Sequence, residues 1–341
     1  MRNSRMGFRR LIKTSSILAG MAMLSGMTAM SAFAADTLGQ PTDGAIDLQP
    51  AAAPLKHDAI FFHDVILMPI ITAITLLVLA LLIWIAVRYN RKSNPVPAKF
   101  SHNTVVEIIW TVVPVLILVF IAFFSFSLLR KYHDMPKPDV VVKATGFQWY
   151  WAYDYPELGV EGVESRVLTE EDAKKAGKPY LLAADNALVV PVGKVVHVKV
   201  TAFDVIHAFA LPAFGLKTDA VPGRLNDTWF KAEKVGTYYG QCSELCGVDH
   251  AYMPIEIKVV TDAEFDDYII KAGGKTKAML ATEARAAQTQ AAADAAKAAA
   301  DAEAAATASA TAPATETAPA AAAETPAIAA TAAVPAATPA Q

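Results

Sequence analysis

The sequence of 341 residues has only two cysteines, and both lie in one short loop, at positions 242 and 246. A chain with a single possible pair of thiols is not held together by a disulfide scaffold. It also lacks an excess of positive charge, since 30 Lys and Arg residues stand against 33 Asp and Glu residues. Proteins that bind nucleic acid normally carry a basic surface, so the composition argues against a nucleic-acid partner.

The chain also has no Cys-x-x-Cys-His motif, which excludes a covalently attached c-type haem. What it has is a loop over residues 241–253 that carries two thiols, an imidazole and a thioether. These four side chains belong to Cys242, Cys246, His250 and Met253. Soft and borderline donors of this kind select copper over magnesium or calcium. We expect His207, upstream on an apolar segment, to close the site.

The amino terminus has the pattern of a secretory signal peptide. Basic residues precede a mostly apolar run over residues 17–30, and Ala32-Phe33-Ala34 supplies a small-x-small cleavage motif. An uncleaved anchor helix is the alternative, but the run is short for a span of about 20 residues. We therefore predict a signal peptide over residues 1–34, cleaved after Ala34, and an extracytoplasmic segment over residues 35–60.

Two apolar stretches, residues 65–87 and 108–129, are long enough to cross a hydrocarbon core as helices. The connection between them is basic and has no acid before Glu107. Because such loops stay in the cytoplasm, we predict a transmembrane hairpin over residues 61–133 in the bacterial inner membrane. The amino terminus and everything after the hairpin then lie on the periplasmic side.

Residues 134–274 have the pattern of a β-rich domain. Gly, Pro and Asp turn signals separate short strand-like runs, which indicates an antiparallel sandwich or barrel. The expected strands cover residues 140–144, 187–191, 195–201, 228–230, 238–240 and 255–260. The motif from Thr261 to Glu264 resembles a capping box, and it predicts a short helix with Phe265, Tyr268 and Ile269 on one face.

The carboxyl-terminal residues 275–341 consist mainly of Ala, Thr, Pro and Glu. This composition predicts a disordered tail without chemistry. The stretch over residues 281–306 is compatible with a transient helix, but it lacks the large apolar residues needed to dock.

The ligand loop differs from a mononuclear blue-copper site, which has one cysteine, two histidines and a distant methionine. Its second cysteine follows the first by four residues, and two thiolates that close can each bridge the same pair of metal ions. His207 and His250 then supply one imidazole to each ion. Met253 and a backbone carbonyl near Glu244 are the weak further ligands. Sharing one electron over two ions limits the structural change on redox cycling, which suits fast electron transfer.

Simpler interpretations exist for the same side chains. Cys242 and Cys246 could form a disulfide in an oxidising compartment, or they could bind zinc together with His250. Met253 before Pro254 could be a core residue. A disulfide or a zinc site accounts for neither Met253 nor the glycine-flanked loop, so a copper centre is the hypothesis that uses every residue.

The run Gln241-Cys-Ser-Glu-Leu-Cys-Gly247, with His250 and Met253, resembles the CuA loop of cytochrome c oxidase subunit II. Other segments resemble further parts of that family. They are the aromatic stretch Phe147-Gln-Trp-Tyr-Trp151, the ligand strand Asp204-Val-Ile-His207, the interface segment Lys217-Thr-Asp-Ala-Val-Pro-Gly-Arg224, and Glu107-Ile-Ile-Trp110 ahead of Pro114. The similarity covers roughly residues 55–270, and the combination is specific.

The resemblance implies a membrane-anchored all-β protein: a two-helix hairpin followed by a cupredoxin-like Greek-key sandwich or barrel. It implies a binuclear copper centre, CuA, with the two cysteines as bridging thiolates. The implied ligands are His207, Cys242, the backbone carbonyl of Glu244, Cys246, His250 and Met253. The side chain of Glu244 also reaches a magnesium ion shared with subunit I in this family.

The resemblance further implies a subunit of a haem-copper terminal oxidase and translocase. Electrons arrive from reduced cytochrome c and pass to haem in subunit I, which carries haem and CuB and reduces dioxygen to water. Subunit III is a further expected partner. The chain alone then catalyses no complete reaction.

Trp149 matches the aromatic residue at which electrons arrive from cytochrome c in this family, although a core tryptophan is the alternative. An acidic run follows the aromatic stretch, and the family docks cytochrome c through such acids. The expected docking acids are Asp154, Glu157, Glu161 and Glu164, together with Asp204. A solvated face explains the same run without any function.

Glu107 matches the glutamate at the mouth of a proton-uptake path into subunit I, although solvation at the membrane boundary also accounts for it. Asp219 and Arg224 match residues near the haem-propionate and magnesium region of that family. A turn-stabilising ion pair between them is the alternative.

Two other classes of protein match the sequence less well. A copper-delivery or thiol-redox protein would need a thioredoxin-like βαβ pattern around its cysteines and a histidine well downstream, whereas here the flanks are β-rich and His207 lies upstream. A quinol-oxidase subunit would have lost the Cys and His ligands, and this chain has all of them.

Overall fold

The protein is described by a computed structural model, which places residues 38–96 and 98–310. The expected signal peptide over residues 1–34 lies outside the described residues, as does the chain beyond residue 310.

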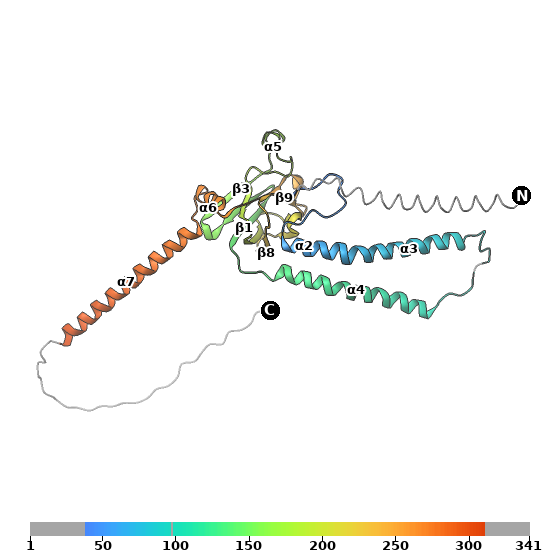
Figure 1. The fold of residues 1–341 in the computed structure, drawn as a ribbon, viewed down its shortest axis with the longest axis horizontal. Helices are drawn as coiled ribbons and strands as arrows, with labels where there is room; N and C mark the ends of the chain where they lie inside the picture. The colour runs from blue at the N-terminus through green and yellow to red at the C-terminus, as the bar shows by residue number, and fades with distance from the viewer. Residues whose placement is uncertain (1–37, 97, 311–341) are drawn as a thin grey trace, which may run out of the picture. The chain divides into compact units, whose positions relative to one another are not determined.

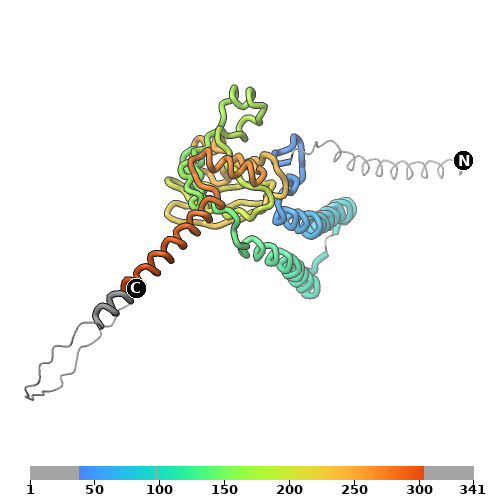
Figure 2. The backbone as a smooth tube through the Cα atoms, turned by 60° about the vertical axis from the view of Figure 1, so that its left-hand side comes forward, coloured from blue at the N-terminus to red at the C-terminus, as the bar shows by residue number. Residues whose placement is uncertain are grey.

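Two long apolar helices begin the described chain. Helix α2 (Pro54–Phe61), a π-helical stretch (Phe62–Leu67) and α3 (Met68–Arg88) are continuous, and α4 (Thr104–His133) returns beside them (Figures 1 and 2). Asn103 caps α4, because its side chain accepts a hydrogen bond from the Val106 N–H. Both helices are long and apolar enough to cross a membrane, with mean hydropathy of 2.9 and 2.8.

A two-layer β-sandwich follows the helices. Its strands are β1 (Val140–Phe147), β2 (Tyr150–Tyr155), β3 (Val160–Ser165), β4 (Leu188–Pro191), β5 (Val195–Ala202), β6 (His207–Leu211), β7 (Leu216–Ala220), β8 (Asn226–Lys231), β9 (Gly236–Cys242) and β10 (Pro254–Val260). They form two five-stranded sheets, in the orders β3-β2-β1-β5-β8 and β4-β10-β9-β6-β7. The sheets are mixed, because β1 pairs parallel with β5 and β4 with β10. The expected fold class, a two-helix hairpin followed by a cupredoxin-like sandwich, is confirmed.

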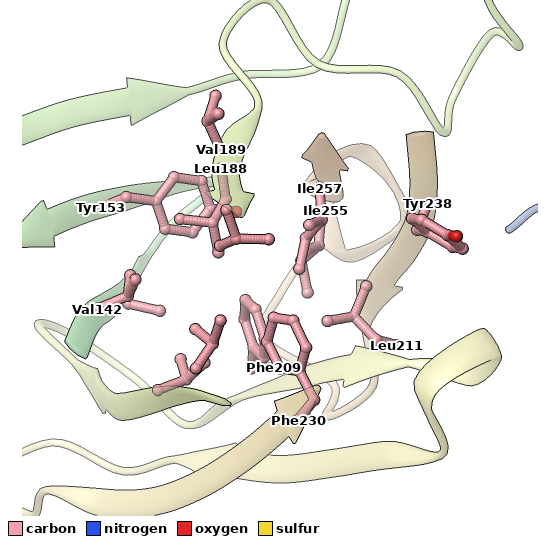
Figure 3. Close-up of a cluster of buried hydrophobic side chains, with 14 of the residues drawn as sticks. Val142, Tyr153, Leu188, Val189, Phe209, Leu211, Phe230, Tyr238, Ile255 and Ile257 are labelled. Carbon is pink, nitrogen blue, oxygen red and sulfur yellow. The ribbon is translucent and has the colours of Figure 1, made fainter. Parts of the chain in front are cut away.

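The core lies between the sheets and is rich in aromatic residues. Side chains on β1, β2 and β5 alternate between the core and the outer face, which places Trp151, Tyr153 and Tyr155 of β2 fully inside. Figure 3 shows Tyr153 together with Phe209 and Phe230 among aliphatic side chains from both sheets. Both β4 and β6 are buried along their whole length.

Three helices lie outside the sheets: α5 (Glu170–Ala176), α6 (Asp262–Lys271) and α7 (Lys277–Ala310). The predicted capping box of α6 is present, and Phe265 and Ile269 face the core as expected. The described chain divides into two units, with the boundary between Leu280 and Ala281. Helix α7 covers residues for which the sequence predicted disorder, because alanine has the highest helix propensity and forms a helix without tertiary packing.

The sandwich is joined directly to the membrane-facing helices. The Ala52 N–H donates to the Ala213 carbonyl at 2.9 Å, and the Tyr132 hydroxyl of α4 donates to the Gly215 carbonyl at 3.0 Å. His57 of α2 lies 3.0 Å from the Glu233 carboxylate. These contacts fasten the ends of both helices to the sandwich, although residues 134–139 connect α4 to β1 without regular secondary structure.

Candidate metal centre

Strand pairing brings the expected copper ligands to one end of the sandwich. His207 begins β6 and Cys242 ends β9, and these strands pair with Phe209 opposite Cys242. The loop over residues 243–253 closes where Gln241 of β9 pairs with Pro254 of β10. One histidine from one strand and the whole ligand loop from the next hairpin therefore meet at a single edge of the sheet.

The donor atoms converge with one histidine beside each cysteine. Cys242 Sγ lies 3.9 Å from His207 Nδ1, and Cys246 Sγ lies 3.5 Å from His250 Nδ1. The Glu244 carbonyl oxygen is 3.3 Å from Cys242 Sγ, and Met253 Sδ is 3.5 Å from Cys246 Sγ. Each thiol is thus flanked by one imidazole and one weak donor.

The two thiols are free and face one another. Their sulfur atoms are 3.9 Å apart, well beyond the ~2.05 Å of a disulfide. His207, Cys242, Cys246 and Met253 are buried. A largely buried pocket with two thiols and two imidazoles suits soft metal ions. The paired arrangement of donors fits two thiolate-bridged copper ions better than a single tetrahedral zinc.

The surroundings of the two thiols shift their pKa values in opposite directions. Burial alone would raise the pKa of Cys242, but hydrogen bonds from His207 and from neighbouring backbone groups lower it to about 7. Burial and the adjacent Cys242 raise the pKa of Cys246 to about 12. The pocket therefore favours the thiolate at Cys242 and the protonated thiol at Cys246, so a bound metal ion would have to displace the second proton.

Asp204 holds His207 from behind. Its Oδ1 lies 2.9 Å from His207 Nε2, which leaves Nδ1 facing Cys242. Burial opposes ionisation of both partners, but their hydrogen bonds prevail: the pKa of Asp204 is lowered and the pKa of His207 is raised. A carboxylate behind a ligand histidine fixes the ring orientation in metal sites. The sequence placed Asp204 in a docking patch, and the structure adds this contact.

Trp149 lies against the ligand loop. Its indole N–H donates to the Cys246 carbonyl oxygen at 3.3 Å. The preceding side chain, Gln148, donates to the same oxygen at 2.7 Å. Sequence reasoning did not select Gln148, although it is the one polar residue in the aromatic stretch over residues 147–151.

An aromatic stack flanks Trp149 on the outer face of the sandwich. Phe147 stacks on Tyr150 with ring centroids 4.7 Å apart, and Phe203 stacks on Phe147 at 5.2 Å. The Arg166 guanidinium caps the stack, 3.7 Å from the centre of the Tyr150 ring. The sequence analysis missed this stack, because Phe203 and Arg166 are distant from the aromatic stretch along the chain.

The four acids of the expected docking run do not form one cluster. Glu164 pairs with Arg166 at 2.9 Å, and Asp154 pairs with Lys143 at 3.3 Å. Glu157 and Glu161 lie at the far end of the β2–β3 hairpin, where Tyr155 pairs with Val160. Five residues of strand separate that end from Tyr150, which corresponds to roughly 17 Å. Among the expected docking acids, Asp204 contacts the turn that holds Trp149, and Glu164 is connected to the aromatic stack through Arg166.

The carboxylate of Glu244 is ion-paired with Lys217 at 2.7 Å. Lys217 also lies 3.3 Å from Asp219, and these acids raise the pKa of its ammonium group. Arg224 is exposed and lines a cavity of about 690 Å³ with Tyr132 and His133 of α4. An ion pair between Asp219 and Arg224, the alternative that the sequence left open, is absent from the described residues.

Glu107 lies far from this site, in the first turn of α4. Its Oε1 accepts the Asn103 N–H at 3.3 Å, so the carboxylate contributes to the cap of the helix. The 26 residues of α4 that follow Glu107, about 39 Å of helix, separate it from the end that joins the sandwich.

Comparisons with known proteins cover most of the described chain. The cytochrome c oxidase subunit II periplasmic domain family matches residues 140–260, and the corresponding transmembrane domain family matches residues 41–128. A probable cytochrome c oxidase subunit 2 of Rickettsia bellii is 44% identical over 247 residues, which is 71% of this chain and 91% of that protein. Cytochrome c oxidase subunit 2 of Cereibacter sphaeroides is 43% identical over 287 residues, 78% of this chain and 94% of that protein.

A solved structure, the periplasmic domain of subunit II of cytochrome oxidase from Bradyrhizobium japonicum, is 57% identical. The match covers 41% of this chain and 96% of the solved domain, with a TM-score of 0.38. The two family matches and the two relatives together carry the assignment. The chain belongs to the cytochrome c oxidase subunit II family, the membrane-anchored, electron-accepting subunit of haem-copper terminal oxidases.

Proposed function

We propose that this chain takes single electrons from reduced cytochrome c at a binuclear copper centre and passes them to haem in subunit I, where dioxygen is reduced to water. The observation that carries the proposal is the pairing of each thiol with one imidazole and one weak donor. A copper pair bridged by two thiolates supplies a store for one electron with little rearrangement.

Each expected ligand has a distinct task. Cys242 and Cys246 would hold the copper ions through their thiolates. His207 and His250 would supply the imidazole ligands, and Met253 and the Glu244 carbonyl would be the weak ligands. Because the pocket is buried and its polar groups are already oriented by the strands, little solvent has to reorganise when charge changes.

Electrons arrive at Trp149, which lies half-buried on the ligand loop and donates to Cys246. Cytochrome c of the lysine-ringed class docks over the aromatic stack, with Glu164 and Asp204 as the near acids. Asp154, Glu157 and Glu161 extend the negative field along the hairpin and steer the encounter from a distance. Attraction of this kind raises the association rate and weakens with salt.

Glu244 is the expected magnesium ligand at the boundary with subunit I. Its carboxylate and that of Asp219 are both held by Lys217, so magnesium replaces Lys217 at Glu244 when it binds. Six oxygen ligands are needed, and this chain offers few here, so subunit I supplies the others. Arg224, exposed at the same edge, faces the haem propionates.

Glu107 stands at the mouth of a proton-uptake path into subunit I. The basic connection between the helices then lies in the cytoplasm, and the copper domain over residues 134–274 lies in the periplasm. Residues 1–34 are a cleaved signal peptide, residues 275–341 extend from the domain as a tail, and subunit III joins the complex.

Electron paramagnetic resonance of the purified oxidase tests the copper assignment. We expect hyperfine structure from two equivalent copper nuclei that share one electron. The spectrum of a single isolated copper would contradict the proposal and would favour a delivery or thiol-redox protein.

Two substitutions test the routes for electrons and protons. Trp149→Ala is expected to keep the copper spectrum while turnover with cytochrome c collapses, because only the point of arrival is removed. Glu107→Ala is expected to slow turnover with the copper spectrum intact. Turnover of Glu107→Ala that equals the wild-type value at every pH would exclude the proton-uptake role.

A further inference from the structure

The turn that carries Trp149 is hydrogen-bonded to both segments that hold the expected copper ligands. The main-chain N–H of Gln148 donates to Asp204 Oδ2 at 2.7 Å. The other oxygen of the same carboxylate, Oδ1, lies 2.9 Å from His207 Nε2. The side-chain amide of Gln148 donates to the Cys246 carbonyl at 2.7 Å. Gln148 therefore joins the His207 segment to the Cys246 loop.

The Cys246 carbonyl accepts two hydrogen bonds from consecutive residues. A carbonyl oxygen has two lone pairs, so the Gln148 amide and the Trp149 indole can both be satisfied. The Gln148 bond is the shorter, at 2.7 Å against 3.3 Å. The orientation of the carbonyl that meets the indole is therefore set mainly by Gln148.

Glycines on both sides of the turn allow the close approach. Gly247 has φ +128°, and a Cβ there would lie 2.9 Å from Trp149 Cζ2 and 3.2 Å from Gln148 Nε2. A Cβ on Gly146 would lie 2.9 Å from the His207 ring. Neither position has room for a side chain without displacing the indole or the ligand imidazole.

We propose that Gln148 is a positioning residue for electron transfer, which fixes the indole of Trp149 on the Cys246 carbonyl. One hydrogen bond and the covalent bonds of Cys246 then connect the indole to a bridging sulfur. One electron leaves the ferrous haem of cytochrome c, which becomes ferric, and reduces the copper pair by one electron. No bond forms or breaks. The inference rests on the proposed function, because it takes Trp149 as the point of arrival.

The test is Gln148→Leu in the purified oxidase, a change that keeps side-chain bulk and removes the amide. Loss of one hydrogen bond to a neutral acceptor corresponds to about a fivefold change in a conformational equilibrium. We therefore expect copper reduction by cytochrome c, followed by stopped flow, to slow about fivefold. Reduction by hexaammineruthenium(II), a small reductant that needs no docked protein, is expected to keep its rate, and the copper resonance spectrum its hyperfine pattern.

Matched controls separate this effect from general damage. Gln290→Leu makes the same change on α7, where the amide bonds only to Asp294, and is expected to leave all three measurements unchanged. Gly247→Ala is a second, steric variant that displaces the indole. Its control is Gly177→Ala, which also has positive φ but open space around the added Cβ.

The outcomes are distinguishable. Wild-type rates with cytochrome c in Gln148→Leu would overturn the inference. So would equal slowing with both reductants and an altered copper spectrum, because Gln148 would then only maintain the metal site. If the wild-type copper itself is not reduced by cytochrome c, the proposed function fails, whatever Gln148 does.

Discussion

The two ends of the β-sandwich are built from different interactions. At the copper end, polar donors from remote segments meet in a buried pocket, where His207, Cys242 and Cys246 take positions that apolar side chains would otherwise fill. At the opposite end, Tyr155 packs on Phe265 and Tyr268 of α6, with ring centroids 6.1 and 6.0 Å away. Burial of thiols and imidazoles serves a metal ion, whereas burial of aromatic rings stabilises the fold. Residues at one end of the sandwich are therefore expected to affect metal binding, and residues at the other end to affect the free energy of unfolding.

The largest effect is expected from Cys246→Ser at the copper end. A serine hydroxyl is a hard donor that stays protonated, so it cannot bridge two copper ions as a thiolate does. The shared hyperfine pattern should disappear, and reduction by cytochrome c should fall to background. Thermal unfolding of the metal-free protein should change little. A large loss of stability in the metal-free variant would mean that the two ends are not separable.

Phe265→Ala is expected to lower stability and to leave the copper centre unchanged, the reverse of Cys246→Ser. Phe265 is buried at the far end, and truncation of a buried phenylalanine costs about 3–5 kcal/mol. Denaturant unfolding should report this loss, while the folded fraction keeps the copper resonance spectrum. An altered spectrum in the folded fraction would show that packing beside α6 is transmitted to the ligand loop.

Thr261→Ala should give a smaller effect of the same kind. The Thr261 hydroxyl caps α6 by accepting the Glu264 N–H, and removal of such a cap costs about 1 kcal/mol. Thermal unfolding should detect the loss, and electron transfer from cytochrome c should be unaffected. Equal stability of the variant and the wild type would show that α6 is held by its buried face alone.

The smallest expected effect concerns pH. Hydrogen bonds from Thr261 lower the pKa of Glu264 below its usual value of 4.5. The folded state therefore binds the proton more weakly than the unfolded chain, so the contribution to stability is present above the usual pKa and is lost as pH falls through the folded pKa. Unfolding curves of Glu264→Gln, which keeps the acceptor without the charge, should lack this acid-dependent part. Parallel pH profiles for both proteins would contradict the assignment.

The sequence predicted the copper end better than its surroundings. The expected ligands Cys242, Cys246, His250 and Met253 are neighbours in the chain, and a loop closed by a β-hairpin keeps them close in space. His207 was found because it interrupts an apolar segment. The hydrogen bonds that hold these residues in place could not be predicted in this way. Gln148 is 56 residues from its partner Asp204 and 98 residues from its partner Cys246. No local pattern encodes contacts of that range.

The strands that the sequence missed have physical reasons. Strand β6 is buried at every residue and so shows no alternation. Strand β3 is buried only at its ends, Val160 and Ser165, so it shows no alternation either, and its acids Glu161 and Glu164 have the pattern of a surface charge run. The α6 capping box was predicted in full because every group in it lies within four residues. Local signals were reliable, and signals that depend on strand partners were not.

The first helix, continuous over Pro54–Arg88, is longer than a bilayer core requires. Its 35 residues correspond to about 52 Å, against roughly 30 Å for the hydrocarbon core of a bilayer. At the domain end of this helix, α2 contacts β8, and Lys131 of α4 pairs with Asp58 at 2.7 Å. One continuous run of helix is therefore long enough both to cross a bilayer and to reach the sandwich, with roughly 20 Å to spare beyond the hydrocarbon core.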